Sequence, residues 1–198
     1  VTGTPEVGTT TTSIKAYIAG LYNTPPAGMT PPSFVLFVGD IADMPTFTEG
    51  GDATDRPYCC IDADLIPDIY YGRFSAANST QLQAILDKTL MYDQFAMPDP
   101  GYLEEVVMIA GMDGSHGTVW ANGQINYGTT YYFNAAHGIT SHTYLYPASG
   151  SSEASILADL SNGVGYANYT AHGSTTDWSD PNITQANVNS LTNYGKYP

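Results

Sequence analysis

Residues 105–114, EVVMIAGMDG, form an apolar run that ends in an acid and a glycine. An unbroken run of aliphatic residues is typical of a strand that is buried on both faces of a parallel sheet. Upstream, Leu82, Ile85, Leu86 and Leu90 recur at helical spacing after an Asn/Ser cap, which predicts a helix over residues 78–97. A buried strand that follows a helix in this way indicates an α/β fold.

The same alternation of strands and helices continues along the chain. Strands are predicted at residues 33–40, 69–75, 139–146 and 164–170, and helices at residues 9–23, 123–137, 152–161 and 184–193. Residues 43–58, rich in Gly, Pro, Asp and Thr, are predicted to be a long loop. This order predicts a three-layer α/β/α sandwich with a mainly parallel sheet. The Pro/Gly-rich stretch at residues 97–105 predicts a boundary between two adjacent subdomains, residues 1–98 and 99–198.

Composition narrows the class of protein. The 198 residues are 42% hydrophobic, and 19 acids face only five Lys and Arg, which gives a formal charge of −14. Such a chain repels phosphates and anionic lipids, so we expect no nucleic-acid partner, and no apolar run is long enough to span a membrane. Abundant Thr, Asn, Gly and Tyr with little Lys are typical of a secreted or cell-surface bacterial protein. The first residues carry no Met and no signal peptide, and we expect them to lie inside a longer precursor.

Polar residues follow three of the predicted strands directly. They are Gly39-Asp40, Asp113-Gly114 and His172-Gly173. The carboxyl ends of parallel strands meet at one edge of a sheet, where functional groups gather. His172 could then act as a general base oriented by Asp113, with the Gly173 backbone close to a ligand. The alternative is that His172 is a surface histidine and Asp113 a helix N-cap.

The segment IDADLIPD, residues 61–68, concentrates hard oxygen donors. Three carboxylates and one main-chain carbonyl could face a common point, which is the donor set that Ca²⁺ prefers. These candidate ligands are Asp62, Asp64, the carbonyl of Ile66, and Asp68. The segment is not an EF-hand, because Pro67 and Arg73 replace its required Gly and Glu. The alternative is a solvated acidic loop.

The two cysteines and the other three histidines give weaker indications of a functional site. Cys59 and Cys60 are neighbours, and a disulfide between adjacent cysteines is strained, so we expect a structural or incidental thiol pair. His116, His137 and His142 lack the spacing of a zinc site. A metallohydrolase centred on His172 is therefore disfavoured.

A family resemblance adds to these interpretations. The motif NYTAHGSTTDWSDP, residues 168–181, resembles the histidine motif of the gingipains, which are secreted cysteine endopeptidases of caspase-like fold. The segments EVGTTTTSIKAYI, FVLFVGD, IPDIYYGRFSA, LDKTLMYDQFAMPDPGYLEEVVMIAG, INYGTTYYFNAAHG and LTNYGKYP resemble successive gingipain segments in the same order. The resemblance covers nearly the whole chain and is greater to the lysine-cleaving member than to the arginine-cleaving ones.

The resemblance implies a role for each residue of the strand-end site. His172 matches the catalytic histidine, Asp113 the acid that orients it, and Gly173 a donor to the oxyanion hole. The family's nucleophilic Cys lies on the strand after LTNYGKY, so we expect it beyond Pro198. The resemblance thus implies an N-terminally truncated first subdomain and an incomplete second, catalytic one. The implied partners are a protein or peptide substrate and the remainder of the catalytic domain.

The resemblance also implies a structural calcium site, with Asp40 joining Asp62, Asp64, Ile66 and Asp68. It leaves the substrate side chain open. Asn126 is neutral where arginine-cleaving members have an acid, and His116 or a neighbour stands where the lysine-cleaving member has a Trp. Trp178 matches a family aromatic, although it could equally be a packing residue. The rival function is a non-catalytic, calcium-dependent binding or scaffold module of the same fold.

Overall fold

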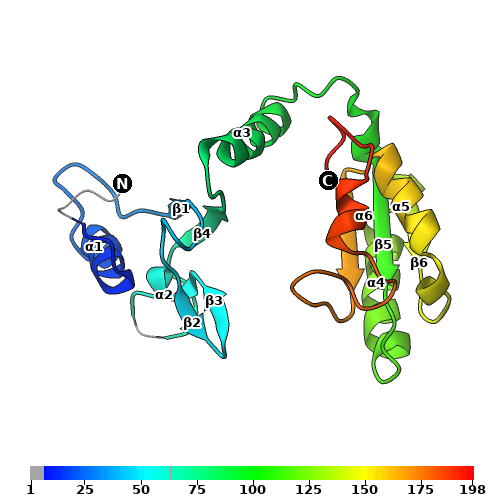
Figure 1. Cartoon of the computed structure of the whole chain (residues 1–198), viewed down its shortest axis with the longest axis horizontal. Helices are drawn as coiled ribbons and strands as arrows, with labels where there is room; N and C mark the ends of the chain where they lie inside the picture. Colours follow the sequence, from blue (N-terminus) through cyan, green and yellow to red (C-terminus); the bar gives the residue numbers. More distant parts are fainter. Residues whose placement is uncertain (1–6, 63) are drawn as a thin grey trace. The chain divides into compact units, whose positions relative to one another are not determined.

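The computed structural model describes residues 7–62 and 64–198. The chain forms two compact units, one up to Thr89 and one from Leu90 to Pro198 (Figure 1). The division lies within helix α3 (Ser79–Asp93), nine residues before the boundary predicted from the Pro/Gly-rich stretch. The described residues include no helix with the length and apolar character needed to cross a membrane.

The second unit is built around strand β5 (Glu105–Ala110), the run at which the sequence predicted a buried strand. It lies between β6 (Thr140–Tyr144) and β7 (Tyr166–Thr170), and both neighbours run parallel to it. Every residue of β5 after Glu105 is buried. The strand therefore forms the centre of a parallel sheet, as an apolar run without alternation indicates.

Helices cover both faces of this sheet (Figure 1). Val107 and Ile109 pack against Ile156 and Leu160 of α5 (Glu153–Asn162). The alternate residues of β5 pack against Ile125 of α4 (Asn122–Tyr131). Successive side chains of a strand point to opposite faces, so the two clusters form two core layers. The predicted three-layer α/β architecture is confirmed.

Short elements join these layers. They are η1 (Pro100–Glu104), η2 (Gly117–Ala121), η3 (Ala135–His137), η4 (Ala148–Ser151) and α6 (Gln185–Asn189). The helix predicted at 123–137 ends at Tyr131, because the Asn134 side chain donates to the carbonyls of Thr129 and Thr130 and closes the last turn. The helix predicted at 184–193 is likewise shorter than expected, and a capping box of Thr184 and Asn187 fixes its start.

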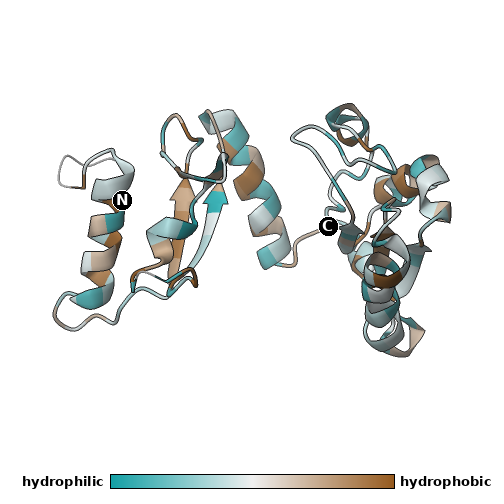
Figure 2. Ribbon diagram, turned by 90° about the horizontal axis from the view of Figure 1, so that it is seen from below, coloured by the Kyte–Doolittle hydropathy of each residue, from teal (hydrophilic) through white to brown (hydrophobic). Residues whose placement is uncertain are grey.

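The first unit contains a second parallel pair, β1 (Phe34–Val38) with β4 (Tyr70–Phe74). Figure 2 shows the hydrophobic β1 beside the more hydrophilic β4. Phe37 and Ile69 pack against Ile18 of α1 (Thr11–Asn23) and against Tyr58 of α2 (Arg56–Cys59). This cluster is the core of the first unit.

The prediction of a long loop at residues 43–58 is wrong. It contains α2 and an antiparallel hairpin of β2 (Phe47–Glu49) and β3 (Asp52–Thr54). Gly50 and Gly51, with φ of 62° and 97°, form the turn between the strands. Positive φ at both central turn residues matches the right-handed twist of a hairpin, and glycine adopts it without strain.

Arg73 on β4 ties the first unit together. Its Nε and Nη2 each donate to a carboxylate oxygen of Asp55 at 2.7 Å, and its Nη1 donates to the carbonyls of Gly39 and Met44. The two charged side chains are only 13% and 10% exposed. Arg73, at the position where an EF-hand has its closing Glu, therefore has a structural role.

Replacing Arg73 with Met should destabilise the protein by about 3 kcal/mol, because the loss of one partner leaves a buried charge uncompensated. Chemical denaturation measures this change. Arg56→Met is the matched control, since Arg56 pairs with the more exposed Glu49 and should cost less. Equal stability losses in the two variants would contradict the structural role of Arg73.

Candidate active site

Two strand ends meet at the carboxyl edge of the second unit's sheet. β5 is followed by Gly111, Met112 and Asp113, and β7 by Ala171 and His172. The Gly111 amide donates to the Thr170 carbonyl at the end of β7 at 3.1 Å, and the Met112 amide donates at 2.9 Å to the carbonyl of Asp180 in the loop that follows His172. The sheet thus fixes the backbone from which both candidate side chains extend.

His172 and Asp113 contact each other at this edge. The Nε2 atom of His172 lies 3.0 Å from Oδ2 of Asp113, and the His172 side chain is 72% exposed. A carboxylate can only accept, so Nε2 carries the proton in this bond. The Nδ1 atom of the neutral ring is then left as a proton acceptor facing away from Asp113.

The Asp113 carboxylate is held rigidly and kept ionised. Its Oδ1 accepts the main-chain N–H groups of Ser115 and His116, both at 2.9 Å. The amide of His116 is the largest cause that lowers the Asp113 pKa to about 2, followed by the amide of Ser115; the rings of His172 and His116 contribute less. The folded-state pKa is depressed, so this stabilising effect is present above the unfolded value near pH 4 and is lost as pH falls toward 2.

Gly173 follows the histidine at the start of the loop between β7 and α6. A Cβ at this position would lie 3.3 Å from the Asp177 carbonyl, which is tight but not blocked. The amide of Gly173 makes no hydrogen bond to any residue that the structure describes. An unbonded N–H beside a histidine can donate to an oxygen that develops negative charge.

Trp178, within this loop, packs against the end of β7. Its ring stacks on Tyr169 of β7, with centroids 4.3 Å apart and planes at 3°. The Tyr169 hydroxyl donates to the carbonyl of His172 at 2.7 Å. Trp178 also packs against the α5 side of the core. Trp178 therefore packs against the segment that carries His172, and it also lines the neighbouring cavity.

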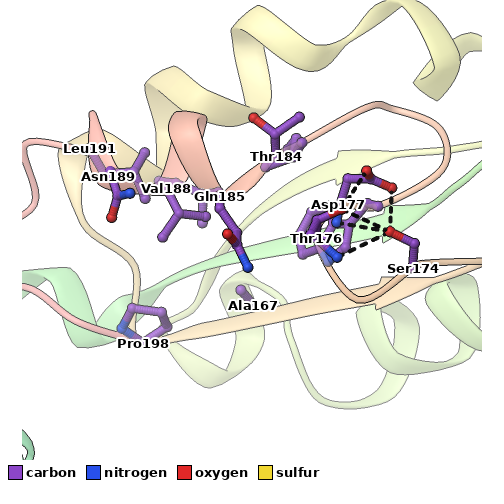
Figure 3. A pocket seen from close by; sticks show the side chains of 13 residues that line it. Ala167, Ser174, Thr176, Asp177, Thr184, Gln185, Val188, Asn189, Leu191 and Pro198 are labelled. Carbon is purple, nitrogen blue, oxygen red and sulfur yellow. Dashed lines mark hydrogen bonds between the residues drawn. The ribbon is translucent and has the colours of Figure 1, made fainter. Parts of the chain in front are cut away.

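A cavity of about 580 Å³ lies beside the same loop (Figure 3). Its walls come from β7, the loop and α6, and include Ala167, Thr176, Val188 and Leu191. Neither His172 nor Asp113 lines it. The cavity is therefore distinct from the strand-end pair.

The acidic segment at residues 61–68 does not form a gathered ligand set. Asp62 and Asp64 each accept a main-chain N–H two residues ahead, and Asp68 accepts the N–H of Ile61 at 2.7 Å. Asp40 accepts the amide of Ile41 and the hydroxyl of Ser75. In residues 7–62 and 64–198, no three His, Cys, Asp or Glu side chains are arranged to hold a metal. The donor chemistry fits Ca²⁺, but the ligands are not preassembled.

Cys59 and Cys60 are free thiols, and both are buried in the first unit. Burial raises the pKa of Cys59 to about 11 and also raises the pKa of Cys60. A nucleophilic cysteine needs a lowered pKa and access to solvent. Neither thiol has these properties.

Two polar contacts were not predicted from the sequence. His116 places Nδ1 3.3 Å from Oδ2 of Asp113, the oxygen that also bonds His172. His142 lies between Glu105, at 2.8 Å, and Asp159, at 3.3 Å. The sequence offered one signal for the contact between His116 and Asp113. Residues three apart lie on the same side of a helical turn, so their side chains can meet.

A histidine held by an ionised carboxylate at the carboxyl edge of a parallel sheet, beside an unbonded amide, has the geometry that a hydrolase needs to activate a nucleophile. Comparison with known proteins agrees with this class. Residues 2–198 match peptidase family C25, and the chain belongs to this family of cysteine peptidases.

The relatives specify the resemblance further. The chain is 42% identical to Lys-gingipain HG66 of Porphyromonas gingivalis over 97% of its residues, which is 11% of that protein. A solved structure described as a protease is 40% identical, with a TM-score of 0.88 over 99% of this chain and 43% of that one. The crystal structure of the Arg-specific proteinase gingipain R has a TM-score of 0.78 at 23% identity, over 98% of this chain and 45% of that one, and shows the fold alone. The predicted greater likeness to Lys-gingipain is confirmed.

Proposed function

We propose that His172, Asp113 and Gly173 form the acid–base half of the active site of a secreted or surface-exposed cysteine endopeptidase that cleaves proteins or peptides. The contact of 3.0 Å between His172 and Asp113 carries the proposal. Membership of family C25 supports the reaction class. The chain spans about a tenth of the Lys-gingipain that it matches, so the activity belongs to the longer protein.

The geometry suggests how each group would act. Nδ1 of His172 takes the proton of a cysteine thiol, and the thiolate attacks the substrate carbonyl carbon to give a tetrahedral intermediate. The Gly173 N–H donates to the oxyanion. The imidazolium then protonates the leaving amine as the C–N bond breaks. Water hydrolyses the acyl-enzyme with His172 again as base, while Asp113 stabilises the imidazolium throughout.

The nucleophile is proposed to be a cysteine outside residues 1–198. Cys59 and Cys60 are buried, and their pKa values are raised. Peptidase activity that is lost on treatment with iodoacetamide would support the proposal. Activity that survives complete thiol alkylation would exclude the cysteine mechanism.

Calcium is proposed to stabilise the acidic segment. Asp40, Asp62, Asp64 and Asp68, with the carbonyl of Ile66, would supply oxygen ligands of the kind that Ca²⁺ binds. The metal would offset the mutual repulsion of these carboxylates and take no part in the chemical step. Ala63 of this segment lies outside the described residues.

Removal of calcium with EGTA should lower the melting temperature by several degrees. A ligand at about 100 times its Kd stabilises a protein by about 2.7 kcal/mol, which corresponds to several degrees at this size. Differential scanning calorimetry before and after restoring Ca²⁺ measures the change. Asp64→Asn should abolish the response, whereas Asp93→Asn on α3 should retain it. An identical melting temperature with and without calcium would exclude the site.

A further inference from the structure

Asp113 has two histidine partners on one oxygen. Oδ2 lies 3.0 Å from Nε2 of His172 and 3.3 Å from Nδ1 of His116. The two rings come from different elements, since His172 follows β7 and His116 immediately precedes η2. Only His172 takes part in the proposed reaction. The contact between His116 and Asp113 therefore has another role.

The backbone around His116 holds the ring in this place. Its amide donates to Oδ1 of Asp113, and its carbonyl accepts the amides of Trp120 and Ala121. The next residue, Gly117, packs against Tyr146 so closely that a Cβ would lie 2.7 Å from the ring. The turn is therefore anchored on both sides of His116, although the His116 side chain itself is 63% exposed.

His116 is not needed to orient the carboxylate. Two main-chain N–H groups already fix Oδ1 of Asp113 at 2.9 Å. The ring of His116 instead adds a second donor to Oδ2, and a carboxylate that serves two donors stabilises each of them less. When His116 is protonated, its positive charge also opposes the charge that His172 acquires during catalysis.

We propose that His116 is a positioning residue that restrains the His172–Asp113 pair, because it competes for Oδ2 and, when protonated, disfavours the His172 imidazolium. This inference rests on the proposed function of the same site. Asp113, from the same turn, contacts His116 directly, and His172, from the loop after β7, contacts the same carboxylate oxygen. Tyr146 packs against the adjoining Gly117. The carbonyl of Asp180, in the loop after β7, accepts a hydrogen bond from the amide of Met112.

The test compares the intact protein with His116→Gln and His116→Phe variants. Histidines labelled with ¹⁵N are followed by NMR from acid to neutral pH, with the His172 ring as the reporter. We expect the midpoint of the His172 transition to rise by about half a pH unit in both variants, as expected when a neighbouring cation is removed from an exposed pair. High salt should shrink the difference between wild type and variant, because it screens exposed charges.

His137→Gln is the matched control. Its ring contacts the Asn134 side chain and not Asp113, so His172 should titrate as in the wild type. A His172 midpoint that is unchanged in both His116 variants would overturn the inference. The readout needs no enzymatic activity. If the wild-type protein cleaves no peptide while the midpoint still shifts, the proposed function fails and the restraint by His116 stands.

Discussion

Replacement of His172 with Ala should reduce peptidase activity of the intact protein by at least about 10³-fold in kcat, with a small change in KM. The imidazole is proposed to remove the thiol proton and to protonate the leaving amine, so both chemical steps lose their proton carrier. Asp113→Asn should reduce kcat as well, because an amide can present its NH₂ group to Nε2 and favour the unproductive tautomer. Steady-state hydrolysis of peptide substrates measures both effects.

The controls separate chemistry from folding. The His172 side chain is 72% exposed, so its removal should change the free energy of unfolding by less than about 0.5 kcal/mol. His137→Ala, which removes a histidine from the same unit, should leave kcat unchanged. An His172→Ala variant with wild-type turnover would show that this histidine is not the base.

Replacement of Gly111 with Ala should destabilise the protein by about 3 kcal/mol and lower its melting temperature by roughly 10 °C. A Cβ at Gly111 would lie 2.5 Å from the Asp180 carbonyl and 2.7 Å from both Ala171 and Tyr169. Two of these contacts belong to the segment that carries His172, which must move to admit a methyl group. The variant should therefore lose activity together with stability.

Gly123→Ala provides a control of opposite sign. Gly123 lies in α4, and a Cβ there meets nothing within 4 Å. Alanine favours a helix over glycine by about 1 kcal/mol, so this variant should be as stable as the wild type or more stable. A Gly111→Ala protein that melts with the wild type would contradict the close packing between the two strand ends.

The sheet and the polar residues at its carboxyl edge could be predicted because the sequence shows them locally. β5 is an apolar run without alternation, and Asp113 lies three residues after its end, as His172 lies two residues after the end of β7. In a parallel sheet, these two strand ends must share one edge. Their contact then depends on a side-chain geometry that the sequence leaves open.

Other features depend on contacts that no local pattern reports. The strands of the β2–β3 hairpin have three residues each, too few for a visible alternation, and only Gly50 and Gly51 marked the turn. For His116 the only local signal is its three-residue spacing from Asp113, and the contact itself arises from a turn that folds back onto Asp113. The acidic segment supplies oxygen donors, but these bond to nearby amides, and the sequence pattern does not specify where the carboxylates point.

The central claim is that His172 activates a cysteine other than Cys59 and Cys60. Reaction of the intact protein with a peptidyl chloromethyl ketone, followed by peptide mapping in a mass spectrometer, tests it most directly. We expect one thioether adduct, on a cysteine outside residues 1–198, and loss of that adduct in His172→Ala. An adduct on Cys59 or Cys60, or equal labelling of the His172→Ala protein, would contradict it.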